Sequence, residues 1–472
     1  MKWRASLAVW LVLGLAWALT PAMAADEAAA DLNPSASSVE QWIEDVKHPT
    51  DWFEWGGDLR LRGIYAENVM FLLNEAEEVF GFEDASYFFR IRGRVWGKAG
   101  PFFVDEGAEC PTGLSVYARV TSEPRYFAQR GFLGRNVPLW DEVVLDNLYV
   151  DWQRIGGAPV SVRVGRQDMV YGRGFVILDG TPLDGSRTIY QDAIKATVHL
   201  DELKSVLDLF YINNKGRQKR IRPLNETEGL VAAFDTSVFG AYLINKQLEG
   251  HELHAYYIYK DEDALAGGSV NNIHTVGGLA QGGFGGNWDY YAELAGQWGS
   301  AMGAPRKAFG LSSDLGYTFK DTTWTPRVHG GFEYLSGDDP TTRTFEGWDP
   351  VLARWPHWSE LYVYTLAMEQ GLPGQYTNVQ RYTLGTSVCP AEKTRVDLDY
   401  SYLRANEHRN VVPAYPFGDG YTRGHLLVAK LTHTWSKWVS GHVWAEYFHP
   451  EDFYTADTDE AMFLRWQLMF KF

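Results

Sequence analysis

The sequence predicts an all-β fold, a transmembrane antiparallel β-barrel of about eighteen strands with short periplasmic turns and long extracellular loops. Three observations support this prediction. The chain ends in a segment whose apolar and polar residues alternate strictly. It opens with an export signal and has no later apolar run of helix length. Its strand-like segments are joined by connections that are alternately short and long.

Residues 1–24 have the pattern of a cleaved secretory signal peptide. Lys2 and Arg4 precede an apolar run over 5–19, and an Ala-x-Ala triplet follows at 22–24. A membrane anchor is the alternative, which the shortness of the run disfavours. No later stretch reaches the ~18 apolar residues of a membrane helix, and only helices and closed barrels satisfy their backbone in lipid. An exported chain of this kind would therefore cross the bacterial outer membrane as a barrel.

The next segment, 25–57, reads as a periplasmic lead-in. It contains a possible short helix over 39–46, ended by Pro49. This segment could reach into the mouth of a barrel. No Pro-, Gly- or Ser-rich linker divides the rest of the chain, so 58–472 is predicted to form one barrel domain.

From Asp58 onward, side chains alternate with the period of two that is typical of a strand. In the first segment, Leu59 and Leu61 fall on one side, and Arg60 and Arg62 fall on the other. Such segments cover 58–65, 89–98, 114–121, 143–152, 160–167, 191–200, 204–213, 235–245, 252–260, 271–281, 288–298, 308–319, 327–336, 376–388, 394–405, 422–435, 439–448 and 461–472. A doubtful further segment, 360–368, is assigned to a loop.

The last segment shows the alternation most clearly. Its apolar row is Met462, Leu464, Trp466, Leu468, Phe470 and Phe472, and the other row contains Arg465, Gln467 and Lys471. A soluble strand would bury the apolar row in a core, whereas about ten residues match a tilted membrane strand that turns this row to lipid. The last strand is expected to pair with the first. A terminal Phe also resembles the assembly signal of bacterial outer-membrane proteins.

The connections alternate in length through most of the chain. Short ones such as "RIGGA", "LDEL", "GGFGG", "KDTTW" and "CPAEK" lie between longer polar stretches at 169–189, 214–234, 337–375, 405–421 and 449–460. This pattern is typical of a membrane barrel with both chain ends in the periplasm, and propellers and sandwiches do not show it. One connection, 99–113, is longer than a periplasmic turn should be.

Composition narrows the partners. Aromatic residues make up 15% of the chain, and Trp and Tyr gather where a surface is half lipid and half water, so outer-membrane lipid is an expected partner. The formal net charge of −17 disfavours nucleic acid. Cys110 and Cys389 lie far apart in sequence and form no disulfide framework, so unpaired cysteines are the favoured interpretation.

If the apolar rows face lipid, the opposite rows face the lumen. The basic residues on those rows are Arg60, Arg62, Arg90, Arg92, Arg94, Arg119, Arg163, Lys195, Arg327, Arg381, Arg395 and Arg465. The acidic ones are Asp151, Glu252, Glu293, Glu333, Asp397, Asp399 and Glu446. A barrel of about eighteen strands leaves a water-filled interior, and Arg and Lys lining such a pore select anions.

Neutralisation of a polar wall is the alternative role for any single arginine. Cross-strand ladders of Arg and carboxylate are common, and an ion pair by itself implies little. The triplet Arg90, Arg92 and Arg94 is harder to explain in this way, because three like charges on one face repel unless neighbours or a ligand compensate. With Arg60, Arg62 and Arg119, the triplet is predicted to form the selectivity surface.

Two loop motifs stand out. "VGRQDMVYGRGFV", 164–176, carries Arg166 and Asp168 at a strand end, and both are predicted to line the pore or bind the solute. The motif precedes no helix and lacks the GK[ST] of a phosphate loop. "FEYLSGDDPTTRTFEGWDP", 332–350, carries Asp338 and Asp339, weak candidates for calcium because Asp and Gly are ordinary turn formers. No cofactor is expected. The acidic stretch 74–84 is interpreted as a solvated rim.

The sequence offers little support for catalysis. It contains no GxSxG, HExxH or paired-cysteine metal spacing, and His425, His433 and His442 are interpreted as lumen or girdle residues. Two alternatives to a channel stay open. One is an outer-membrane barrel enzyme of the lipase or protease type, and the other is a structural or adhesive barrel with a plugged lumen.

The segments "GRQDMVYGRG" and "YLSGDD…TF" resemble those of the alginate export family of outer-membrane barrels, and the resemblance spreads over most of 58–472. It implies an 18-stranded porin with an arginine-rich, electropositive constriction that secretes an anionic uronate polysaccharide passively. By motif, Arg166, Gln167 and Asp168 match the first segment, and Gly337, Asp338 and Asp339 match the second. The acidic first loop and the long second connection depart from the family pattern.

The expected function is a passive channel for an anionic hydrophilic solute, either export of an alginate-like acidic polysaccharide or passage of oligosaccharides. Periplasmic export components are further expected partners. Transport is expected to be passive because the sequence contains no nucleotide-binding motif.

Overall fold

The structure, a computed structural model, describes residues 35–73, 85–104, 112–131, 140, 142–178, 190–217, 220–225, 234–264, 269–353, 356–371, 376–408 and 415–472. The predicted signal peptide 1–24, the acidic stretch 74–84 and Cys110 lie outside these residues. Cys389 is a free cysteine on a barrel strand.

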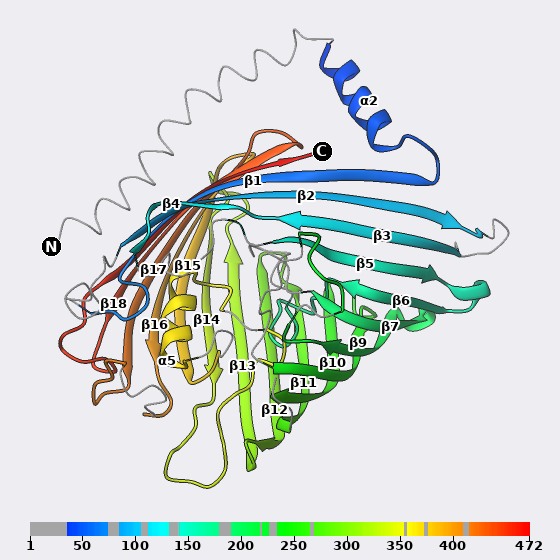
Figure 1. The fold of residues 1–472 in the computed structure, drawn as a ribbon. Helices are drawn as coiled ribbons and strands as arrows, with labels where there is room; N and C mark the ends of the chain where they lie inside the picture. The colour runs from blue at the N-terminus through cyan, green and yellow to red at the C-terminus, as the bar shows by residue number, and fades with distance from the viewer. Residues whose placement is uncertain are drawn as a thin grey trace.

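The strands form one antiparallel sheet that closes into a barrel (Figure 1). They are β1 Phe53–Glu67, β2 Ser86–Phe102, β3 Gly113–Ser122, β4 Arg125–Gln129, β5 Val143–Gln153, β6 Val160–Gln167, β7 Gln191–Leu200, β8 Ser205–Asn214, β9 Phe234–Asn245, β10 His251–Ala264, β11 Ser269–Phe284, β12 Trp288–Ala301, β13 Ala304–Thr318, β14 Arg327–Leu335, β15 Val379–Ala391, β16 Thr394–Arg404, β17 Thr422–Thr434, β18 Val439–Pro450 and β19 Ala461–Lys471.

The segments β3 and β4 are two parts of one barrel strand. Both pair with β2 in one register, with Gly93 opposite Ser122 and Arg90 opposite Arg125. Pro124 separates them, because proline has no N–H to donate to the ladder. The 19 segments therefore make eighteen barrel strands, as the sequence predicts. The sequence prediction ended this strand at Thr121 and missed its second part.

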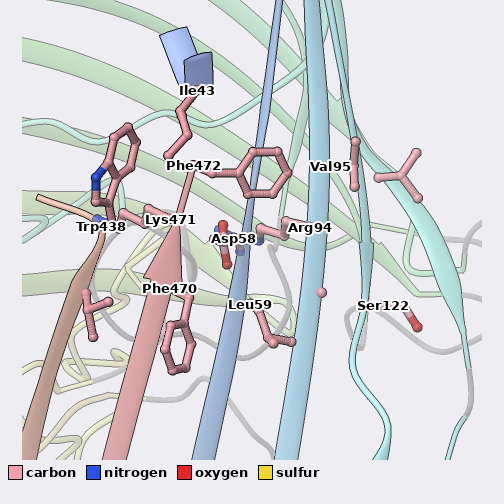
Figure 2. Close-up of a pocket in the computed structure, with 13 residues that line it drawn as sticks. Ile43, Asp58, Leu59, Arg94, Val95, Ser122, Trp438, Phe470, Lys471 and Phe472 are labelled. Carbon is pink, nitrogen blue, oxygen red and sulfur yellow. The ribbon is translucent and has the colours of Figure 1, made fainter. Parts of the chain in front are cut away.

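The first and last strands close the barrel. β1 pairs with β19 from Asp58 to Glu67, and Gly57 and Phe472 exchange two backbone hydrogen bonds of 3.1 Å. Figure 2 shows Leu59, Val95 and Phe470 on the neighbouring strands β1, β2 and β19 at this seam. The seam carries a groove of about 640 Å³ next to Ile43. β1 begins at Phe53, before the predicted barrel boundary at Asp58, because Phe53 already pairs with Ala99.

The two faces of the wall differ as the alternation predicts. Large apolar side chains are exposed on the outer face, among them Leu59, Ile91, Val95, Val150, Val164, Ile194, Phe239, Leu294, Leu315, Leu384 and Phe470. In water such a belt would be costly, whereas in a bilayer it is the surface that contacts hydrocarbon. The inward rows carry buried charged side chains, among them Arg60, Arg92 and Glu293.

Connections also follow the predicted alternation, with exceptions. The periplasmic turns are short apart from 103–112 between β2 and β3, and the longest extracellular connection runs from 336 to 378. On the extracellular side, however, β12 and β13 are joined by Met302 and Gly303 alone. Both residues have positive φ, 48° and 86°, as a two-residue hairpin turn requires.

Two α-helices accompany the barrel in the part of the chain that the structure describes. α2, Ser35–Lys47, is longer than the predicted helix over 39–46. It contacts the periplasmic rim, where the Trp55 indole donates to the Val46 carbonyl at 2.6 Å. α5, Leu361–Glu369, lies in the long seventh extracellular loop, 336–378, where the doubtful segment 360–368 was assigned to a loop without a helix. None of the described helices is long and apolar enough to cross a membrane.

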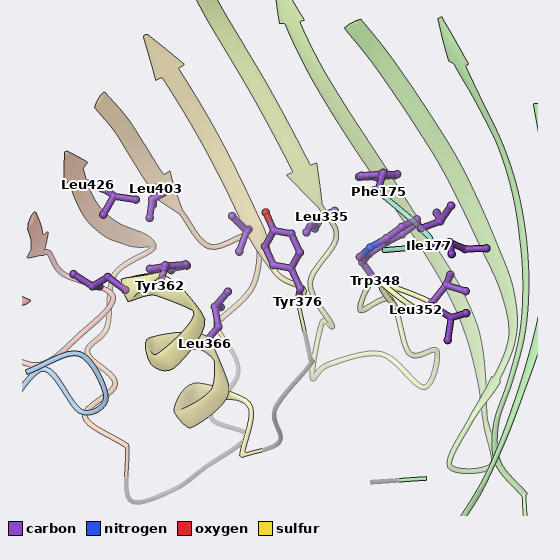
Figure 3. Close-up of a cluster of buried hydrophobic side chains, with 14 of the residues drawn as sticks. Phe175, Ile177, Leu335, Trp348, Leu352, Tyr362, Leu366, Tyr376, Leu403 and Leu426 are labelled. Carbon is purple, nitrogen blue, oxygen red and sulfur yellow. The ribbon is translucent and has the colours of Figure 1, made fainter. Parts of the chain in front are cut away.

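Extracellular loops fold into the barrel and build a hydrophobic cluster against its inner wall. Figure 3 shows members of this cluster around α5 and in the third extracellular loop, which connects β6 and β7. They include Val69, Leu72, Tyr171, Phe175, Val176, Ile177, Trp348, Leu352, Leu361, Tyr362, Leu366, Tyr415, Phe453 and Tyr454. These loops therefore narrow the lumen on its extracellular side.

Candidate pore lining

The predicted arginine triplet lies on the inward row of β2. Arg92 and Arg94 are 3% and 8% exposed, whereas Ile91 and Val95 on the other row are 44% and 55% exposed. Arg90 shares the triplet's row. Strand alternation therefore directs all three guanidinium groups into the lumen.

Neighbouring strands place further arginines beside the triplet. On β1, Arg60 lies opposite Arg92, and Arg62 lies opposite Arg90. Arg465 on β19 faces inward as well and is buried. We call Arg60, Arg62, Arg90, Arg92, Arg94, Arg119 and Arg465 the basic wall. Like charges directly opposite one another are destabilising, so the basic wall needs carboxylates close by.

Glu123 is the main compensating residue, and the sequence prediction missed it. Arg60 Nη2 and Arg90 Nη2 both donate to its carboxylate, each at 2.6 Å. Glu123 precedes Pro124 between β3 and β4 and is 6% exposed. The inward row Tyr117, Arg119, Thr121 continues to Glu123, so the alternation could have identified it had the strand not been ended early.

The remaining arginines of the basic wall are compensated unevenly. Arg92 donates to Asp58 at 2.8 Å, and Arg119 binds Asp146 and Asp168, each at 2.9 Å. Arg62 donates to the neutral Gln467 at 2.6 Å.

Arg94 differs from all of these. It forms no ion pair with any residue that the structure describes, and its Nε and Nη2 are buried without a hydrogen-bond partner. At Arg94, the inward row of β2 thus carries a positive charge that no described residue pairs with.

Most of the other lumen charges form ion pairs, either across neighbouring strands or, for Arg395 and Glu252, within a strand or with a turn residue. Arg163 pairs with Asp151 at 3.1 Å, Lys195 with Asp208 at 3.5 Å, Arg327 with Asp289 and Asp314 at 2.6 and 2.7 Å, His329 with Asp399 at 3.0 Å, Arg395 with Asp397 at 2.7 Å, and Glu252 with Lys246 at 2.5 Å. These pairs match the neutralising role that was the alternative for individual arginines.

Arg166 departs from the predicted lumen row. Register places it opposite Leu148 and Asp192, on the row of the exposed Val164 rather than that of Arg163. It is 2% exposed, pairs with Asp192 at 2.8 Å and lies 3.6 Å from the Tyr190 ring centre. This position belongs to the rim of the wall, because the row of Val164 is the outer one.

Three predicted acids accept hydrogen bonds from uncharged groups. Glu293 accepts from Tyr256 at 3.0 Å and from Tyr291. Glu333 accepts from the Trp358 indole at 3.1 Å. Glu446 on β18 accepts from the Glu360 backbone N–H at 2.7 Å and from the Ser359 hydroxyl, at the start of α5.

α5 is therefore held against the inner wall at both ends. Near its N-terminus, Arg465 pairs with Glu360 at 3.3 Å. At its C-terminus, Glu369 is bound by Arg423 of β17, and both side chains are almost fully buried. Tyr454 donates to Glu369 at 2.5 Å, and burial raises the pKa of Tyr454 well above its usual value, so its hydroxyl stays a donor.

The weak calcium candidates, Asp338 and Asp339, accept hydrogen bonds from their own loop. Asp338 accepts from the Glu346 backbone N–H at 2.9 Å. Asp339 accepts from the backbone and hydroxyl of Thr341, and these bonds hold the pKa of Asp339 below its usual value. Among the residues that the structure describes, no group of His, Cys, Asp and Glu side chains is arranged to hold a metal.

The three histidines occupy wall positions. His425 bonds the Tyr400 hydroxyl at 2.7 Å on the outer face, where Tyr400 is exposed. His433 bonds the Thr394 hydroxyl at 2.8 Å. His442 lies on the inward row and contacts Arg465 at 3.2 Å.

Comparisons with known proteins agree with this geometry. The family described as alginate export matches residues 133–414, more than half of the chain. None of the curated proteins matches it. Among solved structures, Acinetobacter baumannii OccAB2 has a TM-score of 0.55 at 12% identity, covering 89% of this chain and 98% of its own. Pseudomonas aeruginosa OccK5 (OpdH) has a TM-score of 0.53 at 12% identity, covering 88% and 97%.

At 12% identity, these two solved structures support the barrel fold alone. The closed barrel, the outer apolar belt and the family match together identify an outer-membrane channel of a bacterium. The chain belongs to the alginate export family.

Proposed function

We propose that this channel conducts anions in preference to cations and allows an acidic polysaccharide of the alginate type to cross the outer membrane passively. The uncompensated charge of the basic wall supports this proposal most directly. Arg94 has no ion pair among the described residues, and it lies on the same row as Arg90, which pairs with Glu123 at 2.6 Å. Arg stays charged at any working pH and can bind a carboxylate through two parallel hydrogen bonds.

The family description adds the solute class, because alginate is a polymer of uronates whose carboxylates would meet these arginines in turn. The ladders elsewhere in the lumen keep each encounter weak, and conduction needs weak, multiple sites. Delivery to the periplasmic mouth by periplasmic export components belongs to the same proposal.

The test is ion selectivity in planar bilayers. The reversal potential across a KCl gradient is expected to show anion preference for the native channel. The variant Arg90→Gln/Arg94→Gln should reduce that preference, because it removes two lumen charges. Arg154→Gln is the matched control, since Arg154 pairs with Asp201 at 3.0 Å on a periplasmic turn and should leave selectivity unchanged.

Cation preference of the native channel, or selectivity identical in the double variant, would refute the role of the basic wall. Alginate oligosaccharides should interrupt the current more often than neutral dextrans of equal length. A barrel that carries no current at all would favour the alternative of a plugged structural barrel. Hydrolysis of lipid or peptide substrates by the purified protein would favour the enzyme alternative.

A further inference from the structure

The motif "YGRG" forms a tight turn that carries Arg173 into the lumen. Gly172 and Gly174 have φ values of 57° and 83°, which residues with a Cβ rarely adopt. The Gly174 N–H donates to the Tyr171 carbonyl at 2.9 Å. Tyr171 fixes the turn to the wall, because its hydroxyl donates to Asp208 at 2.6 Å and its ring stacks on Tyr242 at 4.1 Å.

Arg173 is positioned by an aromatic ring rather than neutralised by an acid. Its guanidinium lies 4.1 Å from the Tyr291 ring centre, and its side chain is 51% exposed. Its contact with Asp314 is long, 3.9 Å, and Asp314 already binds Arg327 and His329, each at 2.7 Å. The charge of Arg173 is therefore available to a solute in the lumen.

Arg381 on β15 is held in the same way. Its guanidinium lies 4.9 Å from the Trp358 ring centre, and its Nε is buried without a hydrogen-bond partner. The Trp358 indole is fixed by Glu333 at 3.1 Å and by the Tyr376 hydroxyl at 2.7 Å. Among the described residues, no carboxylate lies within ion-pair distance of Arg381.

Both arginines line one pocket between the third and seventh loops, with a volume of about 180 Å³. Its other walls include Phe175, Glu333, Trp348 and Tyr376. Figure 3 shows Phe175 beside Trp348 there, with Tyr376 nearby. Pockets for drug-sized ligands measure about 300–1,000 Å³, so this one suits a single small ring.

We infer that this pocket binds one carboxylated sugar ring of the uronate class. The carboxylate would bind between Arg173 and Arg381, a ring hydroxyl would donate to Glu333, and the apolar face of the ring would pack on Phe175 and Trp348. Two cations without strong acid partners select the charge, and the mixture of apolar and polar walls selects a sugar. This inference rests on the proposed function and names the unit of the polymer that the channel recognises.

The experiment is current interruption by D-glucuronate in planar bilayers. Glucuronate is expected to interrupt the native current, whereas D-glucose at equal concentration should not. Arg381→Gln and Arg173→Gln should each raise the half-blocking concentration about tenfold or more, because each removes a charge-assisted hydrogen bond. Arg395→Gln is the matched control, since Arg395 is a lumen arginine that pairs with Asp397 at 2.7 Å outside the pocket.

Half-blocking concentrations that stay native in both pocket variants would overturn the inference, and so would benzoate binding as tightly as glucuronate. Arg173→Gln changes a half-exposed loop residue, so it keeps the test available if Arg381→Gln fails to assemble. Selectivity in KCl without sugar is measured on the same channels. Retained anion preference with unaltered glucuronate block in both variants would refute the pocket alone, whereas cation preference of the native channel would refute the proposed function.

Discussion

At the scale of single residues, the closing seam depends on a glycine. Gly63 on β1 lies opposite Trp466 of β19, and a Cβ added there would lie 2.6 Å from Cε2 of the Trp466 indole. The indole occupies the place of the missing side chain on the lipid-facing surface. A side chain at this position would force the ring away from the seam.

Gly63→Val is therefore expected to destabilise the closed barrel by about 1–3 kcal/mol, the usual cost of overpacking. The measurement is the temperature at which the folded band is lost in heat-modifiability gels. Gly93→Ala is the matched control, because a Cβ at Gly93 on β2 meets nothing within 4 Å. Equal behaviour of the two variants would argue against the contact between Gly63 and Trp466.

Individual lumen charges show where sequence reasoning succeeds and where it stops. Alternation places Arg90, Arg92 and Arg94 inside the barrel because strand geometry alone decides which face a residue occupies. Alternation does not say that Arg60 and Arg90 would share Glu123, because partners across strands depend on register. The prediction for Arg166 rested on its motif, although alternation from Arg163 already places Arg166 on the opposite row, with Val164.

At the scale of elements, α5 is attached to the wall by hydrogen bonds and ion pairs from charged side chains of three strands. Glu446 of β18 accepts hydrogen bonds at its N-terminus, Arg465 of β19 pairs with Glu360, and Arg423 of β17 binds Glu369 at its C-terminus. A buried carboxylate near a helix N-terminus and a buried cation at its C-terminus both suit the helix dipole. The position of α5 in the lumen follows from these contacts.

Glu369→Gln is expected to release α5, because it leaves the Arg423 charge buried without a carboxylate, a loss of about 3–5 kcal/mol. The expected result is faster proteolysis of the seventh loop in the intact barrel and more frequent opening steps in single-channel current. Arg343→Gln is the matched control, since Arg343 is an exposed residue of the same loop.

The double variant Glu369→Gln/Arg423→Met should be less susceptible to proteolysis than Glu369→Gln alone, because it removes the uncompensated charge. Proteolysis of Glu369→Gln at the native rate would contradict the anchoring role of this pair.

At the scale of the whole molecule, the barrel is a closed unit, and the described residues of α2 contact its periplasmic rim. The described contacts of α2 include the hydrogen bond from Trp55 to Val46 and an ion pair between Glu40 and Lys437 at 3.4 Å. Both involve rim residues rather than the lumen rows. The helix is thus placed beside the barrel and away from the conducting path.

Deletion of Ser35–Lys47 is expected to leave the folded barrel and its conductance intact, because no strand pairing is lost. Heat-modifiability and single-channel conductance of the truncated protein are the measurements. A large rise in conductance on deletion would instead show that the N-terminal segment obstructs the pore.

The eighteen strands, their lipid-facing and lumen-facing rows, and the seam between first and last strand could all be predicted from the sequence. These features could be predicted because the period of two and the lengths of the connections are properties of neighbouring residues in the sequence. The helix at 361–369 was not predicted, because a short apolar run fits either a helix or a strand. The two-residue turn at Met302 and Gly303 was not predicted either, because the flanking strands extend further than their predicted ends at 298 and 308.

Only the tertiary structure decided which charges meet and which loops enter the lumen. Glu123 joins Arg60 and Arg90, and Arg423 joins Glu369, across long sequence separations that periodicity cannot specify. The pocket of Arg173 and Arg381 depends on two loops and a strand folding together. Alternation along the chain assigns each wall residue to a face because it depends on local geometry alone. The partners of these residues depend on strand register and loop packing, which arise only when the barrel closes.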